Sequence, residues 1–206
     1  MKNSTIEIKF LKSVFTLDSC YGSTNDIITW LKQQNDKVSV SVNKINFKSL
    51  INWSFNNEKI SHNSGGFFSI EGLNIKTNWG NIREWDQPVI NQPEVGYLGF
   101  IVKEINGVLH FLMQAKIEPG NLNHVQLSPT IQATRSNYTQ VHDGSKPLYL
   151  DYFKNVSPTN VLLDQLQSEQ GSRFLRKRNR NIIIRVEDDI LIHDNFIWLT
   201  LGHIKK

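Results

Sequence analysis

The sequence predicts a single α+β domain over residues 1–206, in which a mixed sheet is flanked by helices. Two apolar runs in the middle of the chain, residues 97–103 and 108–117, flank Asn106 and Gly107, a pair that is typical of the tight turn of a β-hairpin. Helical spacing of apolar residues near the N-terminus supplies the α component. The chain is long enough to bury one large core, and it contains no internal repeat, linker or low-complexity segment.

The N-terminal part predicts helix followed by strand. Residues 1–35 are expected to be helical, with Thr24 or Asn25 as a cap before apolar side chains at helical spacing. Residues 38–42 alternate valine and serine, which predicts a strand with one polar face.

Further elements are expected on both sides of the central hairpin. The segment 60–73 predicts two short strands joined by a turn at Gly65 and Gly66, because glycine tolerates the bend that such a turn needs. Residues 157–166 predict a helix, with the serine as its cap and the proline in its first turn. The apolar runs 182–186 and 196–202 end the predicted fold.

Composition excludes several classes of protein. The chain carries 23 Lys and Arg against 19 Asp and Glu, and this net charge of +4 argues against a nucleic-acid binder that relies on bulk charge. Cys20 is the single cysteine, so a disulfide framework and a cysteine metal cluster are excluded, and the six histidines lack metal-ligand spacing. No apolar run approaches the roughly 20 residues that span a bilayer, and no signal segment is seen, so we expect a cytoplasmic protein without a membrane partner.

Most of the excess positive charge lies in residues 168–181. Single-stranded nucleic acid is usually bound by basic groups interleaved with aromatic side chains, and Phe174 is the one aromatic residue here. A local site for a diphosphate fits the modest net charge better, and a solvated basic face is the simpler alternative. No nucleic-acid partner is therefore expected.

Three common catalytic signatures are absent from the sequence. It contains no Walker loop, no GxGxxG motif after a strand and no GxSxG elbow. Their absence argues against an NTPase, a Rossmann dehydrogenase and a serine hydrolase.

Residues 114–138 are the best candidate for a polar binding surface. Gln114, Lys116 and Glu118 alternate, so their side chains share one face if the strand continues through them. An amide, a cation and a carboxylate together suit an oxygen-rich anionic ligand. The simpler interpretation, an exposed sheet face with a Lys–Glu pair, is at least as probable from the pattern alone.

Residues 134–138 place a hydroxyl, a guanidinium, an amide and a phenol almost in sequence. Arg135 is suited to bidentate phosphate contacts, although Ser and Asn in loops commonly bond to the local backbone instead. Trp53 lies among polar residues, where it could stack on a nucleobase or a sugar, but most tryptophans are part of the core. His110 lies within an apolar strand and is expected to be structural.

Across these segments the sequence resembles the NDP-hexose 2,3-dehydratase family of deoxysugar biosynthesis. The resemblance covers most of the chain after about residue 45, with the motifs in the family's order. Its most specific blocks are Gln114-Ala-Lys-x-Glu-Pro-Gly-Asn121 and Leu127-Ser-Pro-Thr-x-Gln-Ala-Thr-x-Ser-Asn-Tyr138. The other matching segments are 62–72, 85–99, 168–174 and 198–202.

The resemblance implies a fold and a reaction. Family members are tandem copies of a Nudix-like unit that act on dTDP-4-keto-6-deoxyglucose, which they convert by loss of water across C2 and C3 to a 3,4-diketo-2,6-dideoxy sugar. The C4 ketone acidifies the C3 proton, so a base, an acid and donors to the C4 oxygen suffice in principle, with no redox cofactor or essential metal. The clustered glutamates of the Nudix hydrolase helix are absent, so pyrophosphate cleavage is not expected.

The resemblance also implies site residues. For the acid and the base it gives a shortlist of Tyr138, Glu118, Lys116 and His62, and Glu118 qualifies as the base only if burial raises its pKa. The substrate contacts are expected at Trp53, Gln114, Gln132, Arg135, Ser136, Asn137, Tyr138, Thr139 and Ser172.

The chain departs from the family in length, since it holds one copy of the unit that is tandem elsewhere. We therefore expect a homodimer, in which a second chain replaces the missing copy. The same departure leaves open a non-catalytic nucleotide-sugar-binding or regulatory subunit, and a sugar-nucleotide isomerase would use similar groups.

Overall fold

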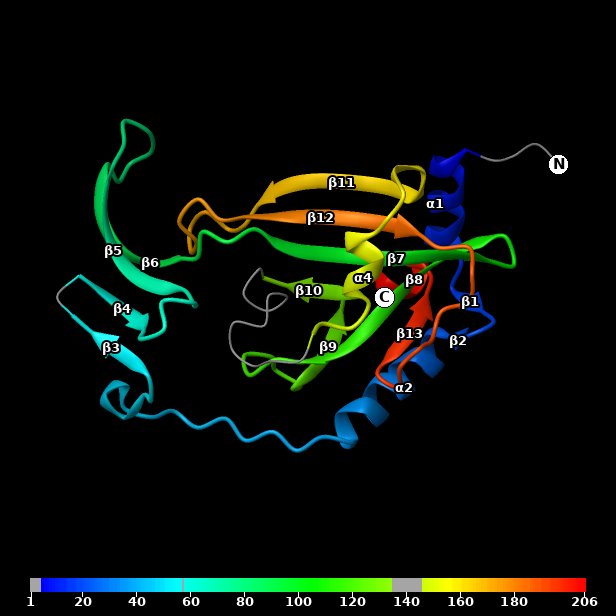
Figure 1. The fold of residues 1–206 in the computed structure, drawn as a ribbon, viewed down its shortest axis with the longest axis horizontal. Helices are drawn as coiled ribbons and strands as arrows, with labels where there is room; N and C mark the ends of the chain where they lie inside the picture. The colour runs from blue at the N-terminus through cyan, green and yellow to red at the C-terminus, as the bar shows by residue number, and fades with distance from the viewer. Residues whose placement is uncertain (1–4, 57, 135–145) are drawn as a thin grey trace.

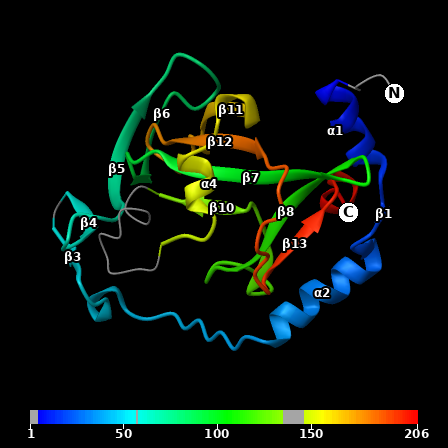
Figure 2. The same cartoon turned by 45° about the vertical axis from the view of Figure 1, so that its right-hand side comes forward.

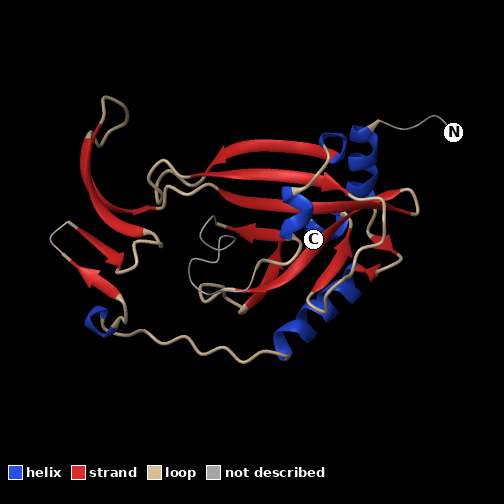
Figure 3. Cartoon of the chain, in the orientation of Figure 1, coloured by secondary structure: helices blue, strands red, loops and turns tan. Residues whose placement is uncertain are grey.

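The computed structural model describes residues 5–56, 58–134 and 146–206. A seven-stranded mixed sheet forms the body of the molecule, and a curved four-stranded antiparallel sheet, the arm, projects from one end of it (Figure 1). Helices pack around the body, so the predicted α+β class with a mixed sheet is confirmed (Figure 3). In the part of the chain that is described, no helix is long and apolar enough to cross a membrane.

Residues 1–35 are expected to be helical, and the structure shows two helices in this region, separated by a small hairpin. Helix α1 (Ile6–Phe15) is followed by the short strands β1 (Asp18–Ser19) and β2 (Gly22–Ser23) and by helix α2 (Thr24–Asp36). The cap of α2 is Ser23, not Thr24 or Asn25. Its side chain accepts from the Asp26 backbone N–H, and the Asp26 carboxylate accepts from the Ser23 backbone N–H at 2.8 Å. This reciprocal capping box satisfies two otherwise unpaired donors, and it fixes the start of the helix.

The strand predicted at 38–42 is wrong. These residues run as an extended connection from α2 to the 3₁₀ turn η1 (Phe47–Ser49), and none of the described strands pairs with them (Figure 2). Alternation of valine and serine favours a strand only where a neighbouring strand supplies hydrogen bonds.

The arm consists of strands β3 (Trp53–Phe55), β4 (Lys59–His62), β5 (Ser69–Lys76) and β6 (Glu84–Asn91). The predicted strands around Gly65 are confirmed as β4 and β5, and Gly65 has a φ of +68°. The arm is attached to the body through Ile90, whose backbone bonds to Arg173 and Leu175 at 2.7 and 2.9 Å.

The body has the strand order β11-β12-β7-β8-β13. The predicted hairpin is confirmed as β7 (Gly96–Ile105) and β8 (Val108–Ile117), with Asn106 and Gly107 at positive φ in the turn. The remaining strands of the body are β9 (Val125–Ser128), β10 (Ile131–Ala133), β11 (Val161–Ser168), β12 (Arg178–Arg185) and β13 (Phe196–Leu199).

Strands β7 and β8 pair only near their turn, through residues 102–105 and 108–111. Beyond this point they diverge, and β10 pairs with β7 while β9 pairs with β8 (Figure 1). We call this opening the strand fork. Thr130 lies at its vertex, where the hydroxyl donates to the Leu112 carbonyl at 2.5 Å and accepts from the Ile101 N–H at 2.9 Å.

The helix predicted over 157–166 is wrong beyond its first turn. Pro158–Asn160 forms the single 3₁₀ turn η2, and the chain then enters strand β11. Strand β11 pairs antiparallel with β12 along its whole length, and Arg180 holds Asp164 with two hydrogen bonds of 2.8 and 2.5 Å. These interactions with a strand that follows later in the sequence outweigh the local helical spacing.

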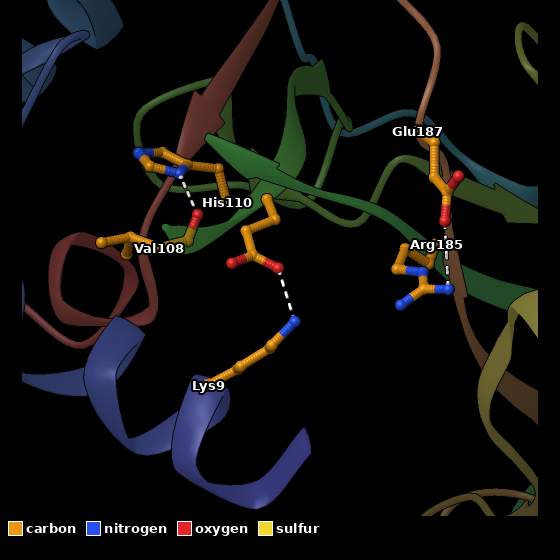
Figure 4. A network of polar contacts seen from close by, with 6 residues as sticks. Lys9, Val108, His110, Arg185 and Glu187 are labelled. Atoms are coloured by element: carbon orange, nitrogen blue, oxygen red, sulfur yellow. Dashed lines mark hydrogen bonds and ion pairs between the residues drawn. The ribbon is translucent and has the colours of Figure 1, made fainter. Parts of the chain in front are cut away.

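Two apolar clusters cover the two faces of the body sheet. One cluster includes helix α4 (Leu150–Lys154), and the other includes α1, α2 and helix α5 (Leu201–Ile204). Lys9 of α1 is paired with Glu104 at 2.6 Å (Figure 4). His110 is buried and its Nδ1 lies 3.0 Å from the Val108 carbonyl, consistent with the expected structural role; burial lowers the pKa of this imidazole.

Candidate functional site

The open end of the strand fork forms a cavity of about 310 Å³. The topology explains why polar residues converge there, because β7 and β12 are parallel and begin at this end, while β8 and β10 are antiparallel to β7 and end at it. The volume lies at the lower end of the range for small-molecule sites. The polar and charged residues that line it are Gln92, Tyr97, Lys116, Glu118, Gln132, Thr134, Glu169, Lys177 and Asn179.

The predicted polar face at the end of β8 contributes one wall. Lys116 and Glu118 line the cavity and form an ion pair of 2.8 Å. A smaller hollow of about 130 Å³ shares both residues and Gln132 with the cavity. Gln114 lies two residues closer to the fork vertex and is not among the residues that line either hollow. The Glu118 side chain is 43% exposed, so the burial that its expected role as a base requires is not found.

A second wall comes from the segment that joins β11 to β12 and from the start of β12. Asn179 donates to the Glu169 carboxylate at 2.5 Å and accepts from the Gly96 N–H at 3.2 Å. Lys177 is buried, and its Nζ donates to the backbone carbonyl of Glu94. Burial lowers the pKa of Lys177, while Glu94 and Glu169 act in the opposite direction.

Lys177, Glu169 and Asn179 were not predicted as site residues. Lys177 belongs to the basic tract, whose members have separate environments in the structure. Arg180 pairs with Asp164 and Arg185 with Glu187, at 2.5 and 3.2 Å (Figure 4 shows the second pair). The sequence signal for Glu169 was its place in the Ser168–Phe174 block.

The other predicted residues lie apart from the cavity or outside the described residues. Trp53 and His62 are cross-strand partners on the arm, with ring centroids 5.5 Å apart. Ser172 is exposed in the turn between β11 and β12, where its carbonyl accepts from Gln87 at 2.8 Å. Arg135, Ser136, Asn137, Tyr138 and Thr139 lie outside the described residues and follow Thr134, which lines the cavity.

A larger hollow of about 920 Å³ lies beside α4 and the end of β12. Its charged groups are largely paired, since Asp151 bonds to Lys146 and Asp189 to Lys103 at 2.5 and 2.6 Å. The fork cavity is the better candidate because both polar blocks of the sequence converge on it. In the described part of the chain, no group of three His, Cys, Asp or Glu side chains could hold a metal ion.

Comparison with known proteins gives a consistent match. A family model described as NDP-hexose 2,3-dehydratase matches residues 24–206. Two proteins named dTDP-4-dehydro-6-deoxy-alpha-D-glucopyranose 2,3-dehydratase are similar over most of this chain. The one from Saccharopolyspora spinosa is 51% identical over 91% of this chain and 40% of its own length. The one from Amycolatopsis orientalis is 49% identical over 94% of this chain and 43% of its own length. The chain thus spans about two fifths of these relatives' length.

Similarity to a solved structure is weaker. The Ap4A hydrolase of C. elegans aligns with 53% of this chain and 81% of its own, at 12% identity and a TM-score of 0.31. This score is too low to define a shared fold, and the Nudix-like part of the expected fold stays a prediction.

Proposed function

The chain belongs to the NDP-hexose 2,3-dehydratase family, and on this premise we propose that it removes water across C2 and C3 of dTDP-4-keto-6-deoxyglucose. The observation that carries the proposal is the fork cavity, which gathers two lysines, two glutamates and three amides from the ends of several strands. We propose residues 1–206 as a single domain of this function, with a Nudix-like fold.

The chemistry of the substrate fits these groups. The C4 ketone acidifies the C3 proton, and the electron pair left on C3 is delocalised onto the C4 oxygen. Hydrogen-bond donors at that oxygen stabilise the enolate, and expulsion of the C2 hydroxyl gives an enol that becomes the 3,4-diketo-2,6-dideoxy sugar.

We assign three hydrogen-bond donors of the cavity to the substrate: Lys116, Gln132 and Asn179. Arg135, Ser136, Asn137, Tyr138 and Thr139 stay proposed contacts, as do Trp53, Gln114 and Ser172, and His62 stays on the shortlist for the acid and base.

Incubation with dTDP-4-keto-6-deoxyglucose tests the proposal. We expect loss of the substrate and appearance of a diketo sugar, detected by NMR after trapping with a ketoreductase.

Gln132→Glu places a carboxylate beside Glu118 in a cavity for an anionic ligand, and should weaken binding of the dTDP-sugar about tenfold or more. The same change at Gln167, exposed on β11, should leave binding unaltered.

Two results would contradict the dehydratase. Tight binding of dTDP with an unchanged sugar would favour a non-catalytic nucleotide-sugar-binding subunit, a candidate suggested by the chain's share of its relatives' length. Conversion to an isomeric keto sugar without loss of water would favour an isomerase.

We further propose that the chain acts as a homodimer, in which a second copy supplies surface that the longer relatives carry within one chain. The arm supports this proposal because it exposes a series of large apolar side chains. Trp79 is 82% exposed, and Phe47, Ile51, Phe55 and Ile82 are also exposed on or beside the arm. Burial of such side chains against a second copy would remove apolar surface from water.

Light scattering at micromolar concentration should give the mass of a dimer. Trp79→Ser should shift the equilibrium toward monomer, whereas Leu191→Ser, at an exposed apolar site on the body, should not. A wild-type chain that stays monomeric, or equal effects of both changes, would count against this interface.

A further inference from the structure

Lys177 differs from the other lysine of the fork cavity in its surroundings. The Lys116 side chain is 25% exposed and is paired with Glu118 at 2.8 Å. Lys177 is 4% exposed, and no carboxylate of the described residues lies within salt-bridge distance of its Nζ. Removal from water disfavours the charged form of an amine, and a lowered pKa makes a lysine better suited to act as a base.

The backbone around Lys177 is fixed on both sides. The Glu169 N–H donates to the Lys177 carbonyl at 3.0 Å, and the Glu169 side chain is in turn held by Asn179. At the other end of the side chain, Nζ donates to the carbonyl of Glu94. One N–H is sufficient for this bond, which leaves the lone pair of a neutral amine available to the cavity that Lys177 lines.

The charged and titratable groups around the site come from several elements. Glu94 precedes β7 and Glu169 follows β11, and both favour the ammonium form of Lys177. Lys116 and Glu118, at the end of β8, line the same cavity as an ion pair, and Tyr97 lines it from β7. Burial is the largest influence on Lys177 and opposes the two carboxylates.

We infer that Lys177, as a neutral amine, is the catalytic base that removes the C3 proton of the substrate; this inference rests on the proposed dehydratase function. The C3–H bond breaks and its proton forms the ammonium at Nζ, while the electron pair forms the C3=C4 bond of an enolate. When the C2=C3 double bond then forms, the C2–O bond breaks. The leaving hydroxyl takes the proton from Nζ and departs as water, so the amine is regenerated.

The test compares Lys177→Arg and Lys177→Met with the wild type. Arginine keeps a hydrogen-bond donor and a positive charge but does not accept a proton. Both variants should lose at least about 100-fold in turnover, the usual size of a general-base contribution. They should also lose exchange of the C3 proton with deuterium in D2O, followed by NMR, while calorimetry should give dTDP binding within about threefold of the wild type. Lys37→Met, at the exposed C-terminal end of α2, serves as the unaffected control.

Two further readouts separate a base from a structural lysine. Wild-type kcat/KM should rise with pH as Lys177 loses its proton. The residual kcat/KM of Lys177→Arg should not show this rise. Ethylamine should restore part of the activity of Lys177→Ala, because it supplies a diffusible base. Retention of C3 exchange in Lys177→Arg, or absence of amine rescue in a folded Lys177→Ala, would overturn the inference. A wild-type protein that binds dTDP without exchange or turnover would instead contradict the proposed function.

Discussion

Replacement of Thr130 by valine is expected to lower the free energy of unfolding by about 2–4 kcal/mol. Valine has nearly the shape of threonine, so the change removes the hydroxyl and little else. The Thr130 side chain is buried, and its hydroxyl bonds to both the Ile101 N–H and the Leu112 carbonyl. Each of these backbone groups would be left buried without a partner, at a cost of about 1–3 kcal/mol.

Urea unfolding followed by circular dichroism measures the effect. Thr130→Ser keeps the hydroxyl and loses one methyl group, so it should cost only about 1 kcal/mol. If serine destabilised the protein as much as valine, the packing of the methyl group rather than the two hydrogen bonds would hold the vertex of the strand fork together.

Replacement of Gly202 by alanine is expected to cost about 3 kcal/mol or more, the upper end of the range for overpacking. A Cβ at this position would lie 2.2 Å from the Thr16 carbonyl oxygen and 2.9 Å from that of Val14. Both are backbone atoms at the end of α1, so relief requires movement of a helix. That end is anchored, since Thr200 donates to the Thr16 carbonyl at 2.6 Å.

Helix propensity alone would predict that Gly202→Ala stabilises the protein, because alanine is favoured over glycine within helices by about 1 kcal/mol. The expected destabilisation therefore has the opposite sign. Gly120→Ala is the matched control. Its Cβ would meet nothing within 4 Å, so we expect a change within about 0.5 kcal/mol. Thermal unfolding of both variants measures the change in stability. If Gly202→Ala were as stable as the wild type, α1 and α5 would not be packed this closely.

The sequence predicted those elements whose signals are local. Asn106-Gly107 and Gly65 mark turns by their own backbone preferences, and both hairpins are confirmed. Segments 38–42 and 157–166 were predicted wrongly because their state depends on strand partners elsewhere. The first has no partner among the described strands, and the second pairs with β12.

The same distinction applies to the site. The alternation of Lys116 and Glu118 placed them on one face, and the structure puts both in the cavity. Lys177 was one cation among several in a basic tract, and its burial is created by the packing of the segments around Glu94 and Glu169, which no local pattern encodes.

The strand fork places the residues that hold the sheet together and the residues that line the cavity at different ends of the same strands. Thr130 and the paired residues at the vertex serve stability, whereas the groups that face the cavity lie toward the open end, at or near the ends of their strands. Substitutions at the open end therefore leave the two hydrogen bonds of Thr130 at the vertex in place. A change in ligand preference then needs substitutions at only a few residues near strand ends, while the vertex that stabilises the sheet is kept.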